Sequence, residues 1–266
     1  MTELVHSTVT DGVATLTLDS PANRNALSPQ LMGELAAGLA AALTDPAVRV
    51  LVLSHTGRVF CSGMDLKAAA RASGAGDMPV TAFPDILTTL WTSPKPVVAR
   101  VAGPARAGGI GLVAACDIAV AGRSATFAFT EVRIGVVPAV ISVPVLPRLA
   151  PRAAHELFLT GEVFDADRAA AIGLVNTAVE DADLDAEVER YVDMLVRGAP
   201  GALAATKEML RRPPAGSMEA DFAAMAALSA ERFAGEEGRE GMAAFAAKRA
   251  ASWIPASRRT TAGPGR

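Results

Sequence analysis

The chain reads Val50-Leu51-Val52-Leu53 and soon afterwards Phe60-Cys61-Ser62-Gly63-Met64-Asp65-Leu66-Lys67, and this stretch decides the fold. The apolar run is typical of a strand buried on both faces of a sheet. A glycine-containing loop follows it directly. The same plan recurs where Pro96–Val101 precedes Gly103–Gly111, and a third apolar run lies at Ile118–Ala121. Because helix-like stretches separate these strands, we predict an α/β fold with parallel pairing.

The N-terminal part extends this plan with a hairpin and a helix. Asp11-Gly12 separates Thr8-Val9 from Val13–Leu18, which predicts a two-residue type I′ turn. Ser28 and Pro29 are typical of an N-cap and a first helical position. One helix face then carries a leucine at every fourth position: Leu31, Leu35, Leu39 and Leu43.

The chain becomes helical beyond about residue 180. Four stretches rich in good helix formers are predicted as helices: Leu184–Val196, Ala202–Leu210, Ser217–Phe233 and Glu236–Arg249. Pro200, Pro213-Pro214 and Gly235 separate them. We therefore expect an α/β core over 1–198, a helical region over 199–254 and a flexible tail over 255–266 that carries Arg258 and Arg259.

The composition excludes several classes of protein. With 266 residues, 51% hydrophobic residues and a net charge of −3, the chain is neither disordered nor a general nucleic-acid binder. No apolar run is long enough to predict a membrane span. The two cysteines, Cys61 and Cys116, form no C-x-x-C motif, so we expect a reducing, cytoplasmic location. Cys61 is interpreted as a buried thiol rather than a nucleophile.

The two glycine loops are the candidate site. Both lie where a strand ends and a helix begins, and backbone N–H groups are free there. One N–H from each loop pointing at one oxygen would form an oxyanion hole. The alternative is that the glycines only allow tight turns, and the spacing leaves both interpretations open. The scattered histidines, His6, His55 and His155, predict no metal site.

The same residues carry a family resemblance. Val59–Leu66 resembles the first active-site loop of the crotonase (enoyl-CoA hydratase/isomerase) family, Gly103–Asp117 the second, and Phe127–Pro138 the third active-site segment. Three later segments are also similar to family motifs: Leu159–Glu162, Ala170–Asn176, and Glu240–Phe245 with Lys248-Arg249. Together they cover roughly residues 5 to 253, and several motifs in order are far more specific than one glycine loop.

The resemblance implies a spiral of ββα turns, a C-terminal helical trimerisation region, a homotrimer or dimer of trimers, and acyl-CoA thioester substrates without a cofactor or metal. The oxyanion donors would be the N–H groups of Met64 and Gly108, and Glu131 the acid/base. The resemblance implies these substrate-binding residues: Arg24, Ser62, Gly63, Asp65, Leu66, Lys67, Gly109, Arg106, Arg133, Phe245 and Lys248.

For four of these residues the pattern leaves an ordinary structural role open. Arg24 and Lys67 are candidates for CoA phosphates or solvated surface charges. Arg133 is a candidate for a substrate carboxylate or a structural salt bridge. Glu131 could be a surface residue on an edge strand, but a buried carboxylate in this apolar stretch would have a raised pKa suited to acid–base work.

The chain departs from the family pattern at Gly111, which replaces the first of two glutamates, and at Ala107, which replaces a glycine. One carboxylate suits a proton shift better than water addition, which favours an isomerase. Glu131–Ser142, however, resembles bacterial methylglutaconyl-CoA-type hydratases, whose substrates carry a distal carboxylate that Arg106 or Arg133 would bind.

We therefore expect an enoyl-CoA hydratase, with two alternatives. One is a Δ3-Δ2-enoyl-CoA isomerase that uses Glu131 as its single acid/base. The other is a non-catalytic acyl-CoA binding protein, because Gly111 removes a carboxylate. The segment from Ala69 to Phe83 is expected to form a mobile loop over the acyl pocket.

Overall fold

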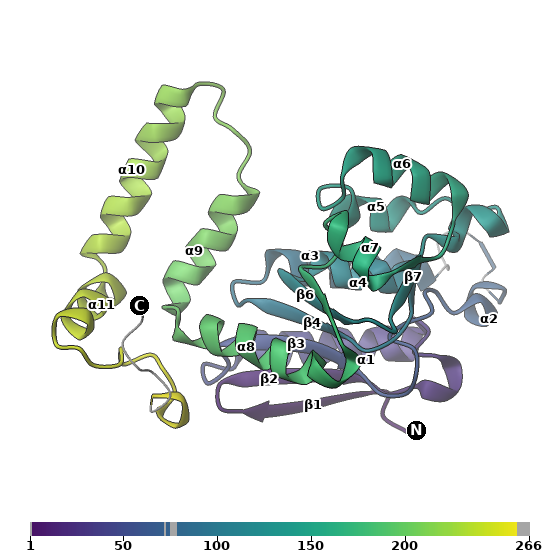
Figure 1. Cartoon of the computed structure of the whole chain (residues 1–266), viewed down its shortest axis with the longest axis horizontal. Helices are drawn as coiled ribbons and strands as arrows, with labels where there is room; N and C mark the ends of the chain where they lie inside the picture. Colours follow the sequence, from purple (N-terminus) through teal and green to yellow (C-terminus); the bar gives the residue numbers. More distant parts are fainter. Residues whose placement is uncertain (1, 72, 75–78, 260–266) are drawn as a thin grey trace.

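The computed structural model describes residues 2–71, 73–74 and 79–259. Its main sheet has the strand order β1-β2-β3-β4-β6-β9 (Figure 1). The strands span Val5–Thr10 (β1), Val13–Leu18 (β2), Val50–His55 (β3), Val97–Val101 (β4), Ile118–Gly122 (β6) and Thr177–Val179 (β9). The β1–β2 pair is antiparallel, and the other neighbours run parallel, as predicted. Asp11 and Gly12 both have positive φ, which confirms the predicted turn.

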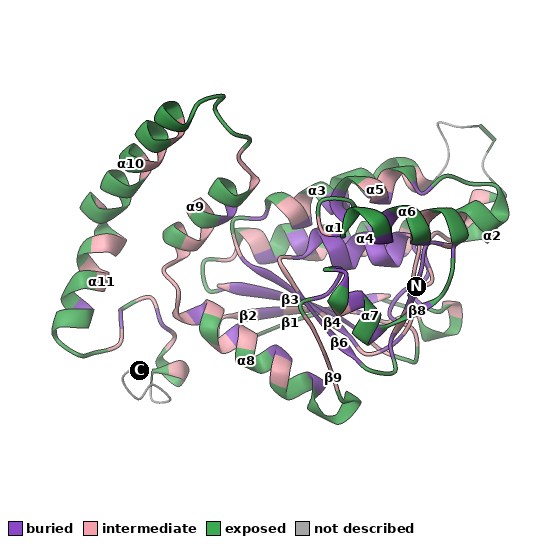
Figure 2. Ribbon diagram, turned by 45° about the horizontal axis from the view of Figure 1, so that its top comes forward, coloured by how far each residue is buried: buried purple, intermediate pink, exposed green. Residues whose placement is uncertain are grey.

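Helices cover both faces of this sheet, which explains why every residue of β3 is buried. Helices α1 (Pro29–Thr44), α3 (Phe83–Thr92) and α4 (Gly108–Ala115) lie on one face, and α8 (Leu184–Arg197) lies on the other (Figure 2). α1 begins as predicted, because the Ser28 hydroxyl oxygen accepts a hydrogen bond from the Leu31 N–H at 3.2 Å.

A second, small sheet lies beside the first and has the order β5-β7-β8. Its strands are β5 (Ala105–Arg106), β7 (Thr126–Ala128) and β8 (Phe164–Asp165). Short helices follow or flank it: η4 (Thr130–Ile134), α5 (Ala139–Val145), α6 (Pro151–Thr160) and α7 (Ala166–Ala171). The sheet joins the second glycine loop to the Glu131 segment, because β5 pairs with β7.

Helices α9 (Pro200–Arg211), α10 (Met218–Ala234) and α11 (Glu236–Ala246) form an arm that projects from the side of the molecule opposite α5 and α6 (Figure 1). Lys207 anchors it to the core. Its buried ammonium donates to Asp117 Oδ2 at 2.5 Å and to the Lys95 carbonyl at 3.0 Å.

The structure corrects one helix end in the C-terminal part and shows contacts in the first residues of the expected tail. α11 ends at Ala246 rather than Arg249, because Lys248 has φ 51° and the Arg249 guanidinium turns back to the Glu240 carboxylate at 2.7–2.8 Å. The tail expected to be flexible is held as far as Arg259. Arg258 is ion-paired with Glu189 at 2.5 Å and donates to the Asp11 carbonyl, and residues 260–266 lie outside the described part.

Candidate active site

The two glycine loops pair with each other along their length. Phe60 N–H donates to the Pro104 carbonyl at 3.0 Å, and Arg106 N–H donates to the Cys61 carbonyl at 2.9 Å. Gly63 lies at the closest approach. With φ +89°, a Cβ built on it would be 2.9 Å from the Ala107 Cβ and 3.5 Å from the Gly108 nitrogen. The fold therefore brings the residue before Met64 directly against the start of α4.

The backbone at this junction turns the two candidate N–H groups away from other partners. Leu27 pairs with the first loop through the Gly63 carbonyl and the Asp65 N–H, so alternation along the strand points the Met64 N–H to the other side. Gly108 is the first residue of α4, and first-turn N–H groups have no partner within their helix. Two donors beside one another at the start of a helix suit a developing negative charge.

Ala107 adopts a backbone conformation that normally favours glycine. Its φ is +47° and its ψ is −117°, and its N–H donates to the Ala128 carbonyl at 3.2 Å. Non-glycine residues in such regions cost on the order of 1–3 kcal/mol and concentrate at functional sites. The departure from the family pattern at Ala107 is therefore also a strained position.

Asp65 acts as the N-cap of α2 (Leu66–Ala69). Its carboxylate accepts hydrogen bonds from the N–H groups of Lys67 at 2.9 Å and Ala68 at 3.2 Å, and from the Asn23 amide at 3.2 Å. Asp65 thus holds the first loop rather than presenting a free charge. The Ser62 N–H donates to the Arg24 carbonyl at 3.1 Å, so Arg24 lies beside the loop, and the side chains of Arg24, Leu66 and Lys67 are exposed.

Glu131 lies on the 3₁₀ turn η4, not on an edge strand, and its side chain is half-buried. Its Oε2 is buried without a hydrogen-bond partner among the described residues. Burial raises the pKa of the carboxyl group, and its own backbone N–H opposes this rise. An orphaned buried carboxylate needs an explanation in the native state, and a proton-transfer role supplies one.

No space for a second carboxylate exists at Gly111. A Cβ built there would lie 2.7 Å from Ile141 Cγ2 and 3.5 Å from Phe83 Cε1, and both side chains are buried. Gly109 is also confined, because its Cβ would lie 2.6 Å from the Cys61 carbonyl oxygen. Sequence reasoning gave Ile141 and Phe83 no role at Gly111, although the Glu131–Ser142 stretch contains Ile141, because only the packing of α3 and α5 on α4 places them there.

Four of the expected binding residues either bond to other protein oxygens or lie at the C-terminal arm. The Arg106 guanidinium donates to the Thr126 carbonyl at 2.5 Å and to its hydroxyl at 2.8 Å. Arg133 donates to the Thr160 carbonyl at 3.2 Å, which is not the salt bridge considered as its alternative. Phe245, with 86% exposure, and Lys248 belong to the projecting arm (Figure 1).

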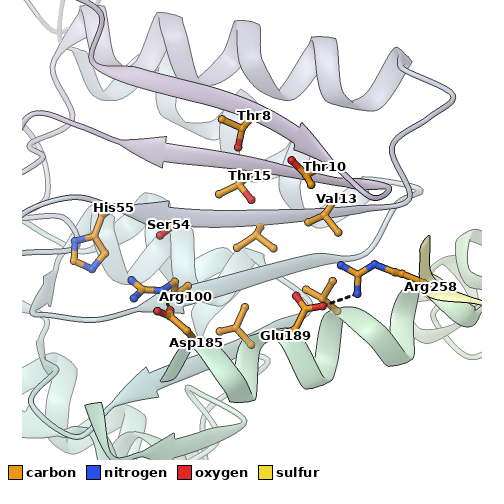
Figure 3. A pocket seen from close by; sticks show the side chains of 13 residues that line it. Thr8, Thr10, Val13, Thr15, Ser54, His55, Arg100, Asp185, Glu189 and Arg258 are labelled. Carbon is orange, nitrogen blue, oxygen red and sulfur yellow. Dashed lines mark hydrogen bonds and ion pairs between the residues drawn. The ribbon is translucent and has the colours of Figure 1, made fainter. Parts of the chain in front are cut away.

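A cleft of about 560 Å³ lies on the other face of the sheet, beneath α8 (Figure 3). Ion pairs line it, between Arg100 and Asp185 and between Arg258 and Glu189, both at 2.5 Å. Its histidine, His55, accepts a hydrogen bond from the Ala102 N–H, and burial lowers the pKa of the imidazole, so it is neutral. Neither Glu131 nor any residue of the two glycine loops lines this cleft.

Two other chemistries find no support in the described residues. Burial raises the pKa of the Cys61 thiol to about 12, so Cys61 is no nucleophile at neutral pH. Over the same ranges no cluster of metal-ligating side chains occurs, and no helix is long and apolar enough to cross a membrane.

The expected mobile loop, Ala69 to Phe83, is described only in part. Residues 72 and 75–78 lie outside the described part of the chain, and α2 and η3 (Pro79–Ala82) flank them.

Known proteins share this arrangement over nearly the whole chain. The family model for enoyl-CoA hydratase/isomerase matches residues 8–255. An enoyl-CoA hydratase structure from Mycobacterium avium is 46% identical, with a TM-score of 0.73 over 95% of this chain and 100% of that one. An enoyl-CoA hydratase structure from Mycobacterium smegmatis is 33% identical, with a TM-score of 0.87 over 94% and 98%. Carnitinyl-CoA dehydratase of Proteus mirabilis is 32% identical over 95% of this chain and 99% of its own. The chain therefore belongs to the enoyl-CoA hydratase/isomerase, or crotonase, family of enzymes.

Proposed function

We propose that this enzyme adds water to a 2-enoyl-CoA thioester, with Glu131 as acid/base and the N–H groups of Met64 and Gly108 as donors to the thioester oxygen. The orphaned Glu131 Oε2 carries the proposal. The Ala107 N–H donates to the carbonyl of Ala128, the last residue of β7, and the turn that bears Glu131 follows β7 directly. The Glu131 segment therefore begins next to the start of α4. The relatives named as hydratases and as a dehydratase support water addition or its reversal.

The proposed reaction proceeds through an enolate. The Glu131 carboxylate takes a proton from water as the water oxygen bonds to C3, and the electron pair of the double bond moves to the thioester oxygen. The Met64 and Gly108 N–H groups stabilise that oxygen most strongly when it is charged, and one such donor is worth about 3 kcal/mol. The protonated Glu131 then returns its proton to C2, which restores the carbonyl.

A Δ3-Δ2 isomerase is the second candidate, and the packing at Gly111 favours it. Because Ile141 fills the space beside Gly111, Glu131 works without a second carboxylate there. In this reaction Glu131 removes a proton from C2 of a 3-enoyl thioester and returns it to C4, while the same two donors hold the dienolate oxygen. A binding protein without turnover is the remaining alternative.

The substrate would reach both glycine loops and a second copy of the chain. The backbone from Ser62 to Leu66, together with Gly109, is proposed to line the CoA channel, and exposed Arg24 and Lys67 to approach its phosphates. Phe245 and Lys248 would meet a neighbouring copy in a homotrimer or dimer of trimers, which fits the exposed aromatic side chains of the arm. Arg106 and Arg133 are weak candidates for a distal carboxylate, because both guanidinium groups donate to nearby protein oxygens.

We also propose that the reaction needs no cofactor and takes place in the cytoplasm. No cofactor beyond the CoA thioester is needed, because the proton transfers use only a carboxylate and two backbone amides. The two buried free thiols, Cys61 and Cys116, fit a reducing cytoplasm.

Mass spectrometry of CoA thioesters incubated with the protein in D₂O tests the proposal. The panel holds crotonyl-, 3-methylglutaconyl- and 3-hexenoyl-CoA. A product heavier by one D₂O supports the hydratase. Double-bond migration or deuterium exchange without hydration supports the isomerase instead. Measurable binding with unchanged thioesters would support a binding protein or a substrate outside the panel.

A further inference from the structure

The turn that bears Glu131 contacts α6 through the bond from Arg133 to the Thr160 carbonyl, and the side chains that follow Glu131 are exposed. The side chains of Val132, Ile134 and Val137 on and after this turn are exposed by 37%, 56% and 75%. The Val136 N–H closes the turn by donating to the Glu131 carbonyl at 3.0 Å. Only residues 135–138 connect the turn to α5, so a shift of α5 would be passed through this short connection to Glu131.

α5 packs against α4, and Ile141 makes the close approach at Gly111. Ile141 Cγ2 lies 2.7 Å from where a Cβ would stand on Gly111, and Ile141 Cβ lies at 3.3 Å. Ile141 is 3% exposed, whereas Val143 on the same short helix is 76% exposed. Phe83, on α3, lies on another side of this point, with its ring edge 3.5 Å away. We call the space at Gly111 between Ile141 and Phe83 the notch.

The notch belongs to the helix face that presents the proposed oxyanion donor. Gly108 and Gly111 are three residues apart on α4, so they share one face, one turn apart. The Phe83 ring touches both positions, at 3.4 Å from a Cβ built on Gly108 and at 3.5 Å from one built on Gly111. The face that receives Ile141 is therefore continuous with the face of α4 at Gly108.

We propose that Ile141, seated in the notch at Gly111, is a positioning residue that sets the distance between Glu131 and the oxyanion donor at Gly108. The inference rests on the proposed function, because it assigns Glu131 and Gly108 to one reaction. Gly111 then has two effects. It lacks a carboxylate, and its missing side chain leaves the space that the Ile141 Cγ2 methyl group fills.

A methyl group at position 111 is the sharpest test of this role. The Cβ of Gly111→Ala would stand 2.7 Å from Ile141 Cγ2, well inside the roughly 3.5–4.0 Å contact distance of two carbon atoms. α5 must shift by about an ångström, and misplacement of that size can cost about 10²-fold in rate. Ile141→Ala in the same chain removes the methyl that clashes.

Steady-state kinetics on the thioester that the wild type turns over fastest supplies the readout, with circular dichroism to confirm folding. We expect Gly111→Ala to lower kcat by about 10-fold to 100-fold with KM changed less than about threefold, because none of the proposed CoA-binding residues lies on α5. Gly111→Ala/Ile141→Ala should recover at least tenfold of that loss. The matched control, Val143→Ala, should leave both constants unchanged.

A second pair of variants covers the case in which Gly111→Ala does not fold. Ile141→Val keeps Cγ2 and should keep kcat within about threefold, whereas Ile141→Leu has the volume of isoleucine without that methyl and should lose about tenfold. Equal kcat values in these two variants, or a double variant that recovers nothing, would overturn the inference. Full turnover in Glu131→Gln would instead overturn the proposed function itself, so the two failures are distinguishable.

Discussion

Replacing Gly63 by alanine tests the joint between the two loops. Gly63 has φ +89°, and the new Cβ would stand 2.9 Å from the Ala107 Cβ and 3.2 Å from the Arg106 carbonyl oxygen. The first loop cannot keep its place beside α4 with that atom present. The Met64 N–H belongs to the next residue, so we expect the substitution to separate the two proposed oxyanion donors.

The expected size of the effect follows from two costs. A non-glycine residue in the left-handed region loses about 1–2 kcal/mol, and overpacking of a tight site typically adds about 1–3 kcal/mol. Together they predict a loss of roughly 2–5 kcal/mol in the free energy of unfolding. Misplacing one oxyanion donor should in addition lower kcat by about 10²-fold.

Urea unfolding and thioester kinetics on Gly63→Ala measure both effects. Gly33→Ala is the matched control, since Gly33 lies in α1 with no atom within 4 Å of its Cβ position; it should gain about 1 kcal/mol and keep its activity. Gly63→Ala/Ala107→Gly removes the nearest atom and should recover part of kcat. A Gly63→Ala protein with wild-type kcat would refute the idea that this contact sets the oxyanion hole.

Three further predictions concern the described core. Lys207→Met leaves Asp117 without its ammonium partner and should lower the free energy of unfolding by about 3 kcal/mol, seen as a fall in Tm of roughly 6–12 °C. An unchanged Tm would show that the pair does not anchor the arm. Burial raises the pKa of Glu131 in the fold, so its neutral form is favoured and ionisation costs stability once the pH exceeds the unfolded pKa. Glu131→Gln should therefore match the wild type in urea unfolding near pH 4 and exceed it by a margin that grows until the pH passes the folded pKa and then levels off; a difference that does not change with pH would contradict the raised pKa. Arg148 lies over the Trp91 ring at 4.7 Å and donates to two carbonyls at the end of α4. Arg148→Lys should therefore lose about 1–2 kcal/mol in thermal unfolding, and an equal Tm would count against the stacking.

Local signals made the main sheet predictable. The Asp11-Gly12 turn and the Ser28-Pro29 helix start each satisfy a backbone requirement within a few residues, and the structure confirms both. The buried run at Val50–Leu53 has no polar alternation, so its burial between helix layers follows from sequence alone. The helices of the C-terminal arm were also found from composition, apart from their ends.

Non-local contacts explain what the sequence did not reveal. α6 was not predicted, although Pro151 at its start is an N-terminal signal. The end of α11 was predicted three residues too late, because Lys248, a non-glycine residue, takes the positive φ that follows the helix. At the candidate site, the glycine loops and Glu131 were recognisable as motifs. The notch that joins Gly111 to Ile141 was not, because it depends on two helices that meet only in the folded chain.

Turnover and binding by Glu131→Gln, measured side by side on the same thioester, show whether Glu131 is the acid/base of the reaction. The amide keeps the shape of the side chain but cannot exchange the proton. The account predicts an unchanged dissociation constant by calorimetry and a kcat lower by about 10³-fold, within the range for general acid–base catalysis. A variant that binds the thioester equally well and turns it over within tenfold of the wild-type rate would contradict the assignment of Glu131.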